Sequence, residues 1–102
     1  MKILITENKR YQLAYKILDD ILNGLTREDY DENKDILFDD KNGRLVMVFQ
    51  GMKNTLYVLR DAVSVLKIFS FDDEELHRLI WRWFKNRIGV EAEDVYLVND
   101  FI

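Results

Sequence analysis

Residues 72–89 have the sequence DDEELHRLIWRWFKNRIG and predict the best-defined element of this chain, a helix over 72–88. Asp72 is followed three residues later by Glu75, a spacing that is typical of a capping box. The acidic residues open the segment and the basic residues close it, which complements the dipole of a helix. Gly89 suits the left-handed residue that ends many helices.

The same helix carries the candidate binding residues. Its core-facing stripe contains Leu76, Leu79, Ile80, Trp83 and Phe84. Beside that stripe lie the candidates, which are Arg78, Trp81, Arg82 and Lys85. Guanidinium groups bind phosphate or carboxylate, and an indole ring offers a stacking surface. Dipole complementarity and an i,i+4 pair between Glu74 and Arg78 are the favoured explanation of the charges alone, but they do not account for Trp81.

Apolar spacing along the rest of the chain predicts one further long helix and several strands. A helix is expected over 7–23, where apolar residues recur at steps of three and four before Asn23-Gly24. Asn42-Gly43 between two apolar runs is a strong hairpin signal. Short apolar runs predict strands at 36–38, 45–49, 55–59 and 95–98, and a short strand or an extended arm at 2–5. The short turns between the central three favour an antiparallel meander.

Two segments are less regular. Residues 26–35 are the most polar stretch and are expected to form a surface loop, in which one helical turn could follow Thr26. Residues 61–70 could form either a short helix or a continued strand. The predicted fold is a single α+β domain over 1–102. It has a three- to four-stranded, mostly antiparallel sheet packed against two longer helices and one short helix. The helices at 7–23 and 72–88 are expected to lie on one face of that sheet.

Composition excludes several classes of function. The net charge of −4 disfavours a general nucleic-acid coat, whose affinity comes from neutralising phosphates. The absence of cysteine excludes disulfides, zinc–thiolate sites and thiol catalysis. No apolar run is long enough to cross a bilayer, so no membrane partner and a cytoplasmic location are expected.

Motifs for metal binding and catalysis fail on inspection. Asp39-Asp40-Lys41-Asn42-Gly43 resembles a calcium loop, but the first and twelfth positions of that loop would be Phe38 and Phe49, which cannot ligate. The acidic residues at 28–35 are expected to be solvated rather than to bind a cation. His77 has no nucleophile near it in the sequence. We therefore expect no metal, no cofactor and no enzymatic activity.

The opening residues Met1-Lys2-Ile3-Leu4-Ile5-Thr6-Glu7 resemble the start of many small uncharacterised proteins encoded by tailed phages and their marine relatives. The hairpin-then-helix arrangement around residues 44–49 and 56–59 is similar too. The clear match covers seven residues. The resemblance implies a virus-associated cytoplasmic protein of unknown activity, and it assigns no site residues.

The sequence thus predicts a small interaction or regulatory protein that acts through protein–protein contacts, with a homodimer as one form in which it could act. The alternative is a nucleic-acid-binding module that uses the basic and aromatic face of the helix at 72–88. Salt dependence separates the two, because binding to phosphates weakens steeply with salt.

Overall fold

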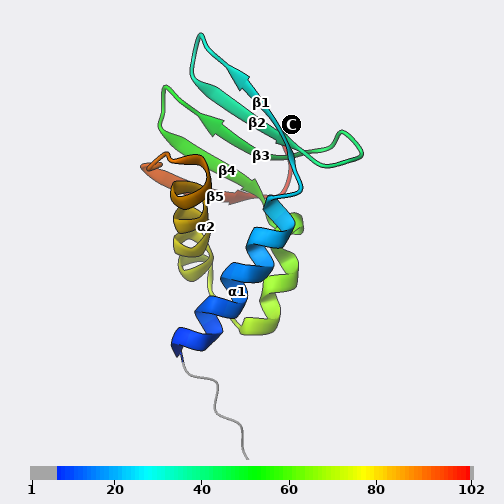
Figure 1. The fold of residues 1–102 in the computed structure, drawn as a ribbon, viewed down its shortest axis with the longest axis vertical. Coiled ribbons are helices and arrows are strands. Elements are labelled where there is room, and N and C mark those ends of the chain that lie inside the picture. Colours follow the sequence, from blue (N-terminus) through cyan, green and yellow to red (C-terminus); the bar gives the residue numbers. More distant parts are fainter. Residues whose placement is uncertain (1–6, 102) are drawn as a thin grey trace, which may run out of the picture.

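Figure 1 shows the computed structural model, which describes residues 7–101. The predicted α+β class is confirmed, and residues 2–5, predicted as a short strand or an extended arm, lie outside the described residues. The elements follow in the order α1 (Glu7–Leu22), β1 (Thr26–Tyr30), β2 (Asp35–Asp39), β3 (Leu45–Gln50), β4 (Thr55–Leu59), the 3₁₀ helix η1 (Arg60–Phe69), α2 (Asp73–Ile88) and β5 (Asp94–Val98).

The five strands form one mixed sheet in the order β1-β2-β3-β4-β5. Strands β1 to β4 are antiparallel neighbours, whereas β5 pairs parallel to β4. A parallel pair requires a long crossover, and η1 and α2 provide it. The sheet is mostly antiparallel, as predicted, but it has five strands instead of three or four.

Strand β1 is the additional strand, and it corrects the prediction of a loop at 26–35. Its sequence TREDY is polar, and all five side chains are exposed, so no alternating apolar pattern marks it. The strand forms because its backbone pairs with β2. Arg27 and Asp29 form an ion pair along it, with 2.7 Å between Nε and Oδ1. Charged side chains on an edge strand discourage pairing with a further chain.

One hydrophobic core lies between the helices and one face of the sheet, which we call the inner face. The strands contribute Ile36, Phe38, Met47, Phe49, Leu56, Val58 and Val95. The two long helices contribute Ala14, Leu18, Leu22, Leu76, Leu79, Ile80, Trp83 and Phe84. Helices α1 and α2 therefore share one face, as predicted, and the β1–β2 hairpin extends beyond them (Figure 1).

Residues 60–69 form a 3₁₀ helix, so of the two alternatives predicted for this region the short helix is correct and the continued strand is not. Val63 and Leu66 are buried, and Phe69 packs partly against the core. This three-residue spacing places the apolar side chains on one side, because a 3₁₀ helix has three residues per turn. Ser70 ends the helix in a left-handed conformation with φ of 57°.

The predicted ends of α2 are confirmed. Asp72 Oδ1 accepts a hydrogen bond from the Glu75 backbone at 2.8 Å, and Glu75 Oε1 accepts one from the Asp72 backbone at 3.2 Å. Gly89 ends the helix with φ of 84°, and its N–H donates to the carbonyls of Phe84 and Lys85.

Asp19 joins α1 to α2. Its Oδ1 accepts a hydrogen bond from Trp83 Nε1 at 2.8 Å, and Arg87 donates to both carboxylate oxygens at 2.8 and 2.6 Å. Trp83 is only 2% exposed, so Asp19 supplies the acceptor for a buried indole. The hydrogen bonds from Arg87 and then from Trp83 lower the pKa of Asp19 below its ordinary value of 3.8.

Candidate functional site

Two of the three predicted cations on α2 are paired with acids of the same chain. Arg78 Nη2 lies 2.9 Å from Glu74 Oε1, one turn earlier on the helix. Lys85 Nζ lies 3.0 Å from Glu91 Oε1, in the segment that follows α2. The pair between Glu74 and Arg78 is the i,i+4 contact expected from the spacing. These two cations therefore already have anionic neighbours.

Trp81 is partly buried and packs against the core. Its Nε1 donates to the carbonyl oxygen of Ala92 at 2.7 Å, and the ammonium of Lys85 lies 5.3 Å from its ring centroid. Trp81 thus holds the segment before β5 against α2. Its indole N–H already has a partner within the fold.

Arg82 differs from its neighbours. Among the arginines of residues 7–101, it alone forms no ion pair with a carboxylate. Its guanidinium lies 5.9 Å from the ring centroid of Tyr11 on α1. It borders a hollow of about 250 Å³ between the two long helices, whose other lining residues are Tyr11, Gln12, Tyr15 and Asn86. The four predicted residues share one side of α2, and Arg82 is the one with a free charge.

The second surface is the sheet face opposite the core, which we call the outer face. Cross-strand pairing aligns Leu37 with Val48, Val48 with Tyr57, and Tyr57 with Tyr96. Paired residues of neighbouring strands point to the same face. We call these four residues the apolar row; it runs from β2 across β3 and β4 to β5.

The apolar row is open to solvent. Leu37, Val48 and Tyr57 are each partly exposed, and Tyr96 is 48% exposed. The rings of Tyr57 and Tyr96 stack with centroids 5.8 Å apart. Toward one end of the strands, Val46 and Leu59 are buried outside the main core. On the outer face, the side chains at that end are thus inaccessible to solvent, whereas those of the apolar row are accessible.

Acidic residues surround the apolar row. Glu28 of β1 pairs with Leu37 and continues the row at one end. By strand alternation Asp35 and Asp39 of β2 and Asp94 of β5 point to the same face. We call these four residues the acidic rim. No outward position of the five strands holds a lysine or an arginine.

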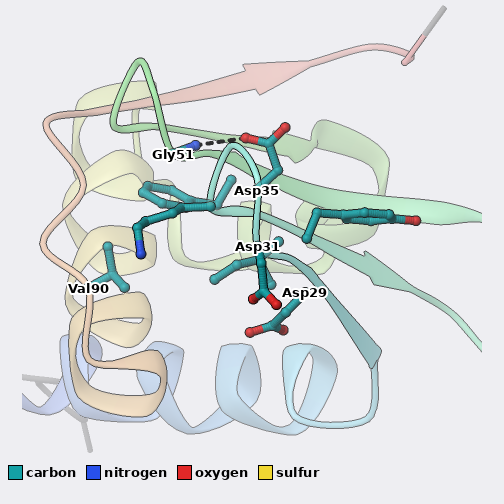
Figure 2. A pocket seen from close by; sticks show the side chains of 9 residues that line it. Asp29, Asp31, Asp35, Gly51 and Val90 are labelled. Atoms are coloured by element: carbon teal, nitrogen blue, oxygen red, sulfur yellow. Dashed lines mark hydrogen bonds between the residues drawn. The ribbon is translucent and has the colours of Figure 1, made fainter.

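A separate hollow of about 340 Å³ lies on the inner side of the β1–β2 hairpin, beyond the helices. Figure 2 shows that the carboxylates of Asp29 and Asp31 point the same way, while Asp35 points away from them toward Gly51. Asp35 Oδ1 accepts a hydrogen bond from the Gly51 N–H at 2.9 Å. Asp29 is already paired with Arg27, which lowers its pKa. The three carboxylates do not converge.

The described residues hold neither a cluster of metal-ligating side chains nor a membrane-spanning helix. Within residues 7–101, no three histidine, aspartate or glutamate side chains are placed to hold a metal ion. None of the helices there has the length and apolar character needed to cross a membrane. His77 is partly buried on α2 and lines none of the hollows described above.

Comparisons of the chain with family models, curated proteins and solved structures found no match. The resemblance of residues 1–7 to phage-encoded proteins therefore stays a prediction.

Sequence reasoning missed the outer face as a site. The signal available was alternation, since Tyr57 and Tyr96 each lie between residues of the opposite face. Alternation does not show which strands are neighbours, however. Only the pairing register shows that the residues of the apolar row line up. The place of Glu28 in the acidic rim depends on β1, a strand that the sequence did not reveal.

Proposed function

We propose that this chain is a small non-enzymatic interaction protein that binds another protein through the outer face of its sheet. The observation that carries the proposal is the apolar row, whose side chains line up across four strands with no helix of residues 7–101 above them. Contiguous exposed apolar surface marks interaction sites, whereas isolated apolar side chains do not. Tyrosine is also enriched among the residues that dominate protein–protein binding energy.

The face of α2 that carries Arg78, Trp81, Arg82 and Lys85 is a second proposed contact surface. It offers less for binding than the outer face, because Arg78 and Lys85 would have to give up acidic partners. The same pairing weakens the case for nucleic-acid binding through this helix, since only Arg82 brings an uncompensated charge. A homodimer remains one form of the protein-binding proposal.

Selection from a random peptide library tests the proposal without a known partner. The full chain is immobilised, and the peptides it enriches are then measured against two variants. Val48→Ser with Tyr96→Ser alters the apolar row, whereas Ile68→Ser removes an apolar side chain that is 72% exposed on η1. We expect the row variant to lose the enriched peptides and the η1 variant to retain them.

The proposal would be wrong if no peptide were enriched, or if the enriched peptides bound the row variant as tightly as the wild type. Circular dichroism and thermal unfolding of both variants confirm that each is folded. If Arg82→Ala lost binding and the row variant did not, the result would show that the contact surface lies on α2.

A further inference from the structure

We infer that the partner segment bound by the outer face is a basic, amphipathic helix about four turns long. This inference rests on the proposed function and adds the chemistry and size of the partner. The dimensions of the open strip, the charges around it and the hollow at one end of it support such a partner.

The dimensions of the strip fit one helix. Five strands about 4.8 Å apart span roughly 20 Å along the row, and neighbouring rows on one face lie about 7 Å apart. The open strip is one row wide, because Val46 and Leu59 are buried on one side of the row and Thr55 is buried on the other. One such row matches the contact side of a single helix, whose diameter with side chains is about 10–12 Å. Two globular surfaces in a stable complex usually each bury about 800 Å², which is more than this strip offers.

The charges around the strip select a cationic partner. The acidic rim places carboxylates at the β1 end and on both sides of the apolar row, and no outward strand position supplies a cation. Arg44 and Arg60 flank the ends of β3 and β4, but they are paired with Asp61 and Asp73. Lys34 and Lys53 lie in the turns beyond the strand ends, and Lys53 borders a hollow that Asp35 also lines. An amphipathic helix could place its central apolar residues on the apolar row and the lysines or arginines on its flanks against the acidic rim.

A hollow at the β1 end fits a long basic side chain. Its volume is about 330 Å³, and it is lined by Tyr30, Asp31, Glu32, Asn33, Asp35 and Leu37. The aliphatic stem of a lysine or arginine can lie against Leu37 while its charged end meets the carboxylates. The exposed ring of Tyr30 adds a face for a cation.

The same charges disfavour the other occupants. A second copy docked face to face would bring one acidic rim against another, and each chain carries a net charge of −4. Like charges placed opposite each other in an interface oppose binding. A nucleic acid would set its phosphates against the same carboxylates.

The test uses two designed probes of about 14 residues, a length that gives roughly 20 Å of helix. One carries leucine on its apolar side and lysine elsewhere; the other replaces each lysine with glutamate. Binding to the full chain is measured by fluorescence anisotropy at low and high salt. We expect the lysine probe to bind at least tenfold more tightly than the glutamate probe.

Three variants separate the rim from the net charge of the protein. Asp35→Asn with Asp94→Asn should weaken binding of the lysine probe about tenfold at low salt. Each lost pair of charges, some 6 Å apart in water, should account for about threefold of this change. Asp20→Asn with Asp61→Asn removes the same charge from exposed sites on α1 and η1, and should change binding less than twofold. Tyr96→Ser should weaken binding without altering its salt dependence.

The outcomes distinguish the partner chemistry from the proposed function. Equal binding of both probes, lost in Tyr96→Ser, would overturn the basic partner and leave protein binding by the apolar row intact. Equal weakening by the rim and control variants would show that only net charge attracts the probe, and would also overturn the inference. Binding of neither probe would overturn the inference, and the library selection would then decide the proposed function.

Discussion

Replacing Asp19 with alanine tests the contact that joins the two long helices. The substitution leaves the indole N–H of Trp83 without its acceptor, in a side chain that is 2% exposed. A buried donor without a partner costs about 1–3 kcal/mol. The exposed end of Arg87 can turn to water and is expected to contribute little. We therefore expect the free energy of unfolding to fall by about 2 kcal/mol.

Urea unfolding followed by tryptophan fluorescence measures this change. Asp20→Ala is the matched control, since Asp20 is the next residue on α1 and its side chain is exposed. In a double-mutant cycle, Trp83→Phe should cost less in the Asp19→Ala background, because the N–H that it removes no longer has an acceptor. A loss of stability no greater than that of Asp20→Ala would show that the hydrogen bond from Trp83 to Asp19 does not stabilise the fold.

The same contact predicts a dependence on pH. Folding lowers the pKa of Asp19 below 3.8, so the ionised carboxylate stabilises the fold above that pH. This contribution is lost as the pH falls through the folded-state pKa. The stability difference between the wild type and Asp19→Asn should thus be largest near neutral pH and shrink below about pH 4. A difference that stays constant down to pH 3 would contradict it.

Three further substitutions test other parts of the fold by urea unfolding. Gly51→Ala should destabilise by about 1–3 kcal/mol, because an added Cβ would lie under 3.0 Å from the carbonyl oxygen of Asn33, whereas Gly24→Ala should be nearly neutral. Asp72→Ala should cost about 1 kcal/mol by removing the cap of α2, and an unchanged stability would count against the cap. Gln50→Met should stabilise by about 1 kcal/mol, because the enclosed Oε1 has no donor in residues 7–101; a loss of stability would show that the amide is satisfied.

Helix α2 could be predicted in detail because its signals are local. The capping box depends on two residues three positions apart, and the end depends on one glycine. Each acts through the backbone of the nearest turn and needs no information about the rest of the fold. The hairpin at Asn42-Gly43 was predictable for the same reason.

Strand β1 and the direction of β5 could not be predicted in this way. An edge strand with exposed side chains on both faces has no hydrophobic period, so its polar sequence reads as a loop. The direction of β5 depends on the path of η1 and α2 across the sheet, which no short segment encodes. Both features follow from tertiary packing rather than from local preference.

For the candidate binding residues, too, local sequence predicted their placement on the helix, whereas tertiary packing decided their contacts. The sequence placed Arg78, Trp81, Arg82 and Lys85 on one side of a helix, and the helix exists. It did not reveal that Glu91 pairs with Lys85, or that Trp81 donates to Ala92. Both partners lie beyond the end of the helix, in the turn toward β5. Which polar groups remain free is thus a property of the folded chain.

The backbone amide chemical shifts of the chain, measured with and without a basic amphipathic peptide, show directly whether the outer face is the contact surface. We predict that the largest shift changes occur in β3, β4 and β5, at and beside Val48, Tyr57 and Tyr96, with little change along α2. Changes confined to α2 around Arg82, with the strand amides unaffected, would contradict this prediction.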